Sequence, residues 1–525
     1  MRHSSVSPAP GRVRPAWPRA AAIAPLALSL AAACGGGHDG PPTSPLTPEF
    51  EAANAPAIWQ GAPGRRNDHI GHTVVPPQPG FAGRAIIAAG GGNPWIEVPQ
   101  APATTHDIVA FFRANPVPGT GAVRPIAAVQ GDEAGDRFGF ALAFGPRLVS
   151  SQATPPDLAV GAPRGPWEEV GEFTERGVVH VVAGADLEAR LGAGPEPIVA
   201  TRMRVYGAIA GGRFGAALAA LDLDGDGGAD LIVGEPGGSL APGFGGRVWR
   251  VPSAGLDRTL AAGLDRIRVD DPRLGATVLA EGEPGDSLGT SLAMLPADPA
   301  RAVPAALLCG ALGLSYDPAA DRWIAGAAGS GHARIVHLDG AGAPTVSTRL
   351  EGGAPESHFG RAIAWAQVGG APIALVGAPF DVGAEGLAVG SVHAFDRSGR
   401  RLWRIDGSQE LARFGWSLAV NGPVLAVGAP NASRAGERFD EARTDPDGFR
   451  RGSLHLLRFD ADPLAPPAPT ARWHAEGARD HLGFSAAAAE LGGQRGFLAG
   501  ALAWPVHPGT EQGRVYLIPT EPMAR

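Results

Sequence analysis

The chain has 525 residues, and its formal net charge of −8 disfavours a nucleic-acid partner. It holds 77 glycines and 51 prolines, a composition that would indicate disorder if no repeat organised it. This length suggests several domains, although a large closed β architecture can use such a length as one unit.

The N-terminus predicts export. Residues 1–19 carry four arginines and no acidic residue, and residues 20–33 form an apolar stretch too short to span a bilayer. Small residues that end at Cys34 resemble a bacterial lipoprotein signal. The resemblance implies that residues 1–33 are removed, that Cys34 is lipidated, and that Gly35 favours the outer membrane. An ordinary secretory signal with an incidental cysteine is the alternative. Residues 34–50 then form a flexible tether.

The rest of the chain repeats one phrase seven times. Each copy has a Phe-Gly-like step, an apolar run that ends in Gly-Ala-Pro or a relative, and a Gly-x-Val-x-apolar run. Because a repeated unit buries its apolar faces only against its neighbours, this pattern dominates the fold prediction. The steps are Ile70-Gly71, Phe138-Gly139, Phe214-Gly215, Leu288-Gly289, Phe359-Gly360, Phe414-Gly415 and Leu482-Gly483.

Each copy predicts four short strands, because runs of five to eight Val, Ile, Leu and aromatic residues between Gly and Pro are typical of strands. The last copy has no fourth strand of its own, since only six residues follow Pro519. We therefore expect residues 56–61 to pair beside residues 513–518 and to leave no long open edge. The sequence predicts an all-β fold over residues 51–525: a seven-bladed β-propeller of four-stranded antiparallel blades, closed by an N-terminal strand that completes the last blade.

One loop has the pattern of a metal site. Residues 222–230 place Asp222, Asp224, Asp226 and Asp230 at positions 1, 3, 5 and 9, and the carbonyl of Gly228 is a further candidate ligand. Calcium needs six to eight oxygen ligands, which alternate residues of a tight loop can supply. An EF-hand does not fit, because position 12 is Val233 and the loop joins two strands. A solvated acidic turn is the alternative to calcium.

The Phe-Gly steps, the Gly-Ala-Pro runs and the acidic loop together resemble the FG-GAP repeat of the integrin alpha-subunit propeller, over roughly residues 56–519. Ile70, Leu288 and Leu482 depart from the family's Phe. The resemblance implies one structural calcium at Asp222, Asp224, Asp226 and Asp230. It also implies adhesion, or recognition of a protein or glycan, in place of catalysis. The integrin-type ligand site depends on a partner subunit, whereas this chain is expected to be a monomer.

The order of strands in a blade predicts the face on which a partner binds. In an antiparallel blade the loops between strands 2 and 3 share one face, opposite the acidic loop, and these loops are long in this chain. Exposed loops on a rigid scaffold often carry function, and aromatic residues are favoured interface anchors. Each ring could instead only pin down its own loop. The candidate binding residues are Trp95, Trp167, Phe244, Trp323, Phe380, Phe439 and Trp504.

Signals for catalysis are weaker. Cys309 lies in an apolar run and is interpreted as a buried structural thiol. Histidines recur at one third-strand position, which marks a register in the sheet more simply than a shared metal site. An envelope enzyme acting on polysaccharide, or a structural outer-membrane assembly factor, remains an alternative to the binding module. The enzyme would use acids and bases beside the Phe-Gly steps, the candidates being Asp136, Asp286, Glu356, His358, Asp480 and His481.

Overall fold

A computed structural model describes residues 43–45, 57–60, 71–81, 84–90, 107–113, 125–133, 135–150, 155–165, 175–191, 199–237, 243–317, 322–325, 331–433, 451–475, 480–491, 494–502 and 513–520. Residues 41–525 form one compact unit, and residues 1–40 are a separate unit. The predicted signal and Cys34 lie outside the described residues.

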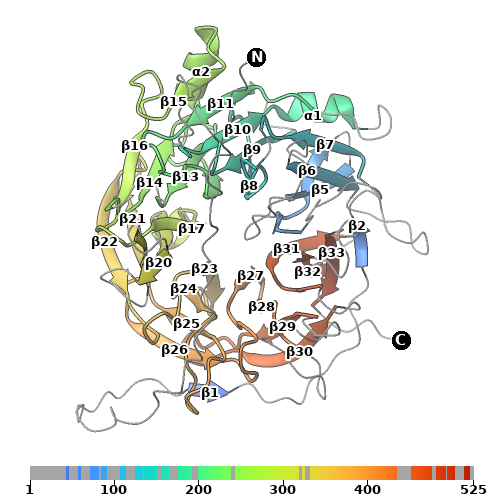
Figure 1. The fold of residues 1–525 in the computed structure, drawn as a ribbon, viewed down its shortest axis with the longest axis vertical. Helices are drawn as coiled ribbons and strands as arrows, with labels where there is room; N and C mark the ends of the chain where they lie inside the picture. Colours follow the sequence, from blue (N-terminus) through green and yellow to red (C-terminus); the bar gives the residue numbers. More distant parts are fainter. Residues whose placement is uncertain are drawn as a thin grey trace, which may run out of the picture. The chain divides into compact units, whose positions relative to one another are not determined.

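Seven sheets form the blades, each built on four antiparallel strands, and Figure 1 shows them arranged around one axis. Blades 1 to 4 are β3 (Thr73–Val74), β5 (Arg84–Gly90), β6 (Ile108–Arg113) and β7 (Ala127–Gln130); β8 (Ala141–Gly145), β9 (Asp157–Ala162), β10 (Val178–Val182) and β11 (Met203–Tyr206); β12 (Ala217–Leu221), β13 (Asp230–Glu235), β14 (Arg247–Val251) and β16 (Thr277–Glu281); and β17 (Leu288–Leu295), β18 (Ala306–Ala311), β21 (His332–Leu338) and β22 (Pro344–Leu350).

The remaining blades complete the ring. They are β23 (Ala362–Val368), β24 (Ala371–Ala378), β25 (Ser391–Phe395) and β26 (Arg401–Asp406); β27 (Ser417–Asn421), β28 (Val424–Ala429), β29 (Ser453–Arg458) and β30 (Ala468–His474); and β31 (Ser485–Leu491), β32 (Gln494–Ala501), β33 (Arg514–Pro519) and β2 (Ala57–Gln60). The pairing of β2 with β33 joins Gln60 to Arg514 and Ala57 to Tyr516. The predicted blade count and the closure by the N-terminal strand are therefore confirmed.

Several elements lie outside the four-stranded pattern. Between third and fourth strands lie α1 (Gly184–Arg190) in blade 2 and α2 (Ser253–Ala261) in blade 3. After α2, β15 (Arg266–Arg268) pairs in parallel with β11 and thereby links blade 3 to the outer edge of blade 2. A short β1 (Thr43–Pro45), within the predicted tether, pairs in parallel with β26 of blade 5. The minor elements β4 (Gln78–Phe81) and the 3-10 turn η1 (Pro299–Arg301) lie in blades 1 and 4.

The described core consists of clusters that each join two adjacent blades. One cluster, for example, packs Ile87 and Phe112 of blade 1 against Leu498 and Val515 of blade 7, and so seals the ring at its closure. The others join blades 1 and 2, 2 and 3, 3 and 4, 4 and 5, 5 and 6, and 6 and 7 in the same way. Each blade therefore buries its apolar faces against its neighbours, and this burial is the main favourable term in folding.

The glycines of the repeat make the closest contacts between blades. Each Phe-Gly glycine has a positive φ, between 88° and 103°, which side chains rarely tolerate. The carbonyl oxygen of each lies against a glycine near the end of the second strand of the preceding blade. A Cβ built on that second-strand glycine would stand 1.9 to 2.1 Å from the carbonyl oxygen. The pairs are Gly90 with Gly139, Gly161 with Gly215, Gly234 with Gly289, Gly310 with Gly360, Gly377 with Gly415, Gly428 with Gly483 and Gly500 with Gly71.

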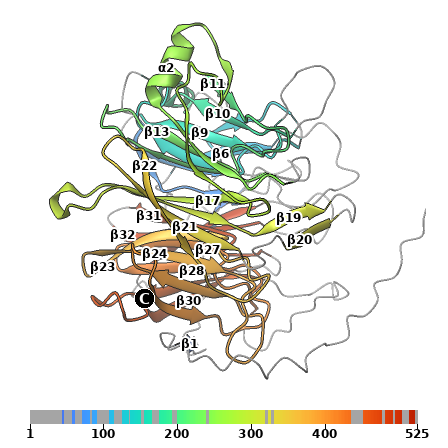
Figure 2. The same ribbon diagram turned by 90° about the vertical axis from the view of Figure 1, so that its left-hand side faces the viewer.

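The two faces of the ring differ. Loops between strands 2 and 3 share a face with the Phe-Gly steps, and loops between strands 1 and 2 lie on the other, as antiparallel order requires. In blade 4 the 2–3 connection forms a hairpin of β19 (Leu314–Asp317) and β20 (Arg322–Ala325). Figure 2 shows this hairpin projecting from the stacked strands.

Candidate functional site

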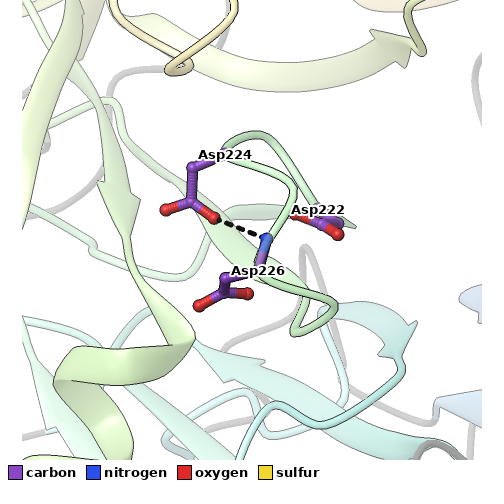
Figure 3. Close-up of side chains that lie close together, drawn as sticks. All are labelled: Asp222, Asp224 and Asp226. Carbon is purple, nitrogen blue, oxygen red and sulfur yellow. Dashed lines mark hydrogen bonds between the residues drawn. The ribbon is translucent and has the colours of Figure 1, made fainter.

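The acidic loop is the tight turn between β12 and β13. One carboxylate oxygen each from Asp222, Asp224 and Asp226 lies within 4.8 Å of the others, and the three side chains come from one turn (Figure 3). Asp222 accepts hydrogen bonds from the backbone N–H groups of Gly225 (2.7 Å) and Gly227 (3.0 Å). These bonds hold the turn, and they leave Asp224 and Asp226 exposed to solvent.

Asp230 lies apart from this group, buried at the first residue of β13. Its Oδ2 accepts from the N–H of Leu223 (3.2 Å) and from Nε of Arg250 (2.9 Å) on β14. The same guanidinium donates from Nη2 to Asp224 Oδ2 (2.6 Å) and from Nη1 to the carbonyl of Ala341 in blade 4 (2.7 Å). Arg250 therefore ties two of the four acids together, a partner that the sequence pattern did not predict.

Asp230 Oδ1 is a buried oxygen with no hydrogen-bond partner. Burial raises the pKa of Asp230 to about 6, although the nearby Arg250 acts in the opposite direction. An unsatisfied buried acceptor is costly unless another ligand reaches it.

The equivalent acid of blade 2 has a full set of donors from the protein. Asp157, at the first residue of β9, is fully buried, and it accepts from the N–H groups of Val149 (2.8 Å) and Gly184 (2.8 Å). Both of its oxygens have donors, because Val149 reaches Oδ2 and Gly184 reaches Oδ1. In blade 3 the Oδ1 position has no donor, while an acidic loop lies nearby. The donor set of blade 3 therefore fits a hard divalent cation.

The predicted binding residues are only partly within the described structure. Phe380 lies in the 2–3 loop of blade 5 and packs on His358 at a centroid distance of 4.5 Å and on Trp416 at 6.4 Å. Phe244 packs under Arg247 of its own blade (5.3 Å), as expected if it pins its own loop. Trp323 pairs across the hairpin with Tyr316. Outside the described residues lie Trp95, Trp167, Phe439 and Trp504.

Sequence reasoning missed the residue that follows each Phe-Gly glycine. In blades 2, 1, 7 and 6 this residue is Phe140, His72, Phe484 and Trp416, and successive rings lie 4.9, 5.3 and 5.3 Å apart. Four blades thus bring one contiguous row of rings together on the side of the Phe-Gly steps, where Phe140 and Phe484 are half-buried and His72 and Trp416 are buried. We call this row the aromatic arc. The shared position in the repeat was the signal that could have found it.

The acids beside the Phe-Gly steps are used in hydrogen bonds within single blades. Asp136 accepts from the N–H of Phe138 (2.9 Å), and burial raises its pKa to about 7. Other acids pair within their own blade with the side chain at the third-strand position that histidine often occupies. These pairs are Trp249 with Glu235 (2.7 Å), Arg334 with Asp286 (3.3 Å), His393 with Asp381 (3.2 Å) and Tyr516 with Asp480 (2.9 Å).

Cys309 is fully buried in the core between blades 3 and 4. Burial raises the pKa of its thiol to about 12, so the thiolate needed for nucleophilic chemistry does not form near neutral pH. In the described part of the chain, helices are too short or too polar to cross a membrane.

Comparison with known families matches residues 214–249 to the FG-GAP repeat. The third blade is thus similar to an FG-GAP repeat. The matched segment runs from the Phe-Gly step at Phe214, through the acidic loop, to Trp249 on β14. The paired glycines extend the same arrangement to the other blades of the propeller, including those in which Leu288 and Leu482 replace Phe. No curated protein matches the chain.

Proposed function

We propose that this FG-GAP propeller is a calcium-stabilised recognition module of the bacterial cell envelope, which binds a protein or glycan on the face of its 2–3 loops. A β-propeller is a general interaction fold, and exposed residues on a rigid scaffold are suited to binding. The observation that carries the proposal is the gathering of aromatic side chains from several blades on this one face.

Calcium has a structural role in this proposal. Asp222, Asp224, Asp226 and Asp230 would hold the ion, with the carbonyl of Gly228, and the unpartnered Asp230 Oδ1 supports this assignment. The ion would supply positive charge to a loop in which Arg250 is the cation paired with Asp224 and Asp230. The loop lies on the opposite face from the 2–3 loops, so calcium acts on the scaffold and not on the ligand.

Asp226→Ala tests the calcium assignment. We expect the wild-type protein to melt at a higher temperature in calcium than in chelator, because a ligand that binds the folded state stabilises it. The variant should melt at nearly the same temperature in both. Asp460→Ala, at an exposed acid of blade 6, should keep the wild-type difference. If Asp226→Ala retains the full response to chelator, the assignment is wrong.

Photo-crosslinking tests the recognition face. A photo-reactive residue at Phe380 should capture an envelope ligand, whereas one at Leu464 should not, since Leu464 is 55% exposed and follows β29 in the 3–4 connection on the other face. Equal capture at the two positions would contradict the proposed face. Light scattering of the purified protein should report a monomer.

Anchoring rests on the N-terminal signal. We propose that lipid on Cys34 holds the propeller at the outer membrane. Cys34→Ser should abolish incorporation of radiolabelled palmitate and release the protein from the membrane fraction. Cys309→Ala, which removes the buried thiol, should leave both unchanged. Absence of labelling in the wild type would favour the ordinary secretory signal, and continued labelling of Cys34→Ser would contradict lipidation at Cys34.

The enzyme alternative has weaker support. Asp136, Asp286 and Asp480 are used in hydrogen bonds within separate blades, which favours a structural role over a shared catalytic one. Turnover of envelope glycans by purified protein would nevertheless favour an enzyme, and stable co-purification with a membrane complex would favour an assembly factor.

A further inference from the structure

Two arginines lie at one end of the aromatic arc. Arg361 follows the Phe-Gly glycine of blade 5, and its guanidinium carbon lies 4.5 Å from the centroid of the Trp416 ring. Arg413 precedes the Phe-Gly step of blade 6, and its guanidinium carbon lies 4.9 Å from the Phe380 ring and 5.3 Å from the Trp416 ring. Both arginines are half-buried, so their charges lie in a less polar setting than bulk water.

The end of the aromatic arc beside Arg361 and Arg413 carries positive charge. Burial lowers the pKa of Arg361 to about 10, and the like charge of Arg413 lowers it further, so Arg361 stays charged at neutral pH. Burial also lowers the pKa of His358 to about 4, and both arginines add to this shift. His358 is therefore neutral at pH 7.

Backbone geometry fixes these side chains. Arg413 and His358 each precede a Phe-Gly step and have positive φ, 61° and 54°, in the left-handed region that non-glycine residues seldom adopt. Such conformations cost free energy and persist only where the surrounding structure imposes them. The backbone at both positions is thus set by the repeat itself.

A hydrogen-bond donor also lies at this point. The Trp416 side chain is 4% exposed, and its Nε1 is buried with no hydrogen-bond partner. A buried N–H without an acceptor is costly, as is a partly desolvated positive charge. A ligand that brings anionic oxygen atoms to Trp416 and Arg361 would satisfy both groups.

We propose that the aromatic arc and Arg361 with Arg413 form a binding site for an acidic glycan, with a uronic-acid carboxylate held by the arginines. This inference rests on the proposed recognition function and names its ligand class. Guanidinium groups form strong charge-assisted hydrogen bonds with carboxylates. The half-buried rings of Phe140 and Phe484 offer apolar surface to the C–H faces of neighbouring sugars.

An extended glycan suits this site better than an acidic peptide. The rings from Phe140 to Trp416 contact one another, with centroids 4.9 to 5.3 Å apart, and so form one continuous apolar strip. Such a strip suits the C–H faces of a sugar chain, whereas an acidic peptide would need donors and acceptors for its backbone as well. One end of the row carries the charge, so an acidic sugar there sets the position of its neighbours.

Calorimetry with defined oligosaccharides tests this inference on the full mature chain. The probes are oligosaccharides of hyaluronan and of polymannuronate, the same molecules with their carboxylates reduced to alcohols, and polyglutamate. We expect binding of at least one uronate probe, weakened about tenfold or more by carboxyl reduction, since a charge-assisted contact is lost. Arg361→Gln should weaken binding by a similar factor. Arg400→Gln, at an exposed arginine between β25 and β26, should not.

Melting curves in calcium and in chelator show whether Arg361→Gln is folded. Trp416→Phe gives a second test with less change in packing, because it keeps an aromatic ring but removes Nε1. It should weaken uronate binding while retaining the melting temperature within a few degrees. Absence of uronate binding, equal binding of reduced probes, unchanged binding by both variants, or tighter binding of polyglutamate would each overturn the inference. Capture of a protein at Phe380 in the last case would leave the proposed recognition face intact.

Discussion

The carbonyl oxygen of Gly71 lies against the Cα of Gly500, so that a Cβ built on Gly500 would stand 1.9 Å from that oxygen. These two glycines belong to the first and the last repeat, and the hydroxyl of Ser485 donates to the same carbonyl at 2.8 Å. The contact repeats at every blade interface, which explains why the phrase of the repeat has two glycines. At this interface it also closes the ring.

Gly500→Ala should destabilise the propeller by about 2 kcal/mol or more, because an added methyl group must displace backbone and not a flexible side chain. Denaturant unfolding measures the loss. Gly340→Ala is the matched control, since a Cβ at Gly340 meets no atom within 4 Å and the backbone there needs no glycine. Equal stability of the two variants would show that the interface is looser than described.

Arg250→Gln should increase the dependence of stability on calcium. Loss of the Arg250 guanidinium leaves the buried Asp230 carboxylate without its ion-pair partner, which typically costs about 3–5 kcal/mol of stability. A bound cation should recover part of this loss, so the melting temperatures in calcium and in chelator should differ more than in the wild type. A difference no larger than that of the wild type would mean that the ion and Arg250 do not act on the same carboxylates.

Glu235 should make the propeller less stable as pH rises. Burial raises its pKa to about 7 from an ordinary value of 4.5, and the hydrogen bond from Trp249 opposes this only in part. Between these pH values the folded chain keeps a proton that the unfolded chain has lost, so stability falls with rising pH. The free energy of unfolding falls by about 3 kcal/mol in total, and this decrease is complete near pH 7 and absent below pH 4.5.

Glu235→Gln isolates this contribution, because the amide is uncharged at every pH. The difference in unfolding free energy between wild type and variant should shift in favour of the variant as pH rises from 4.5 to 7. A constant difference between wild type and Glu235→Gln across this range would contradict the raised pKa.

The repeat made the architecture predictable. Two glycines and an apolar run recur in register, and the missing fourth strand of the last copy fixed the closure by residues 56–61. The additions at blade edges were not predictable, because β15 pairs with a strand of another blade and β1 with a strand far along the chain. Such pairings depend on which blade edges are free in the folded ring. The sequence around β15 and β1 does not indicate those edges.

The sites were predictable to different degrees. Alternating carboxylates indicated the grouping of Asp222, Asp224 and Asp226, since all three lie in one turn. Arg250 was not predictable as their partner, because only the pairing of β13 with β14 brings it there. The aromatic arc needed the ring itself, since His72 and Phe484 meet only where the first and last repeats are neighbours.

Gln60→Cys with Arg514→Cys tests the closed ring most directly, because these positions are paired on β2 and β33. Mild oxidation of the purified double variant should form a disulfide within one chain, seen as faster migration on a non-reducing gel that reductant reverses. Either single variant should not shift. Absence of the bond, or disulfide-linked dimers in which the strand completes a neighbour's blade, would contradict a ring closed by its own N-terminal strand.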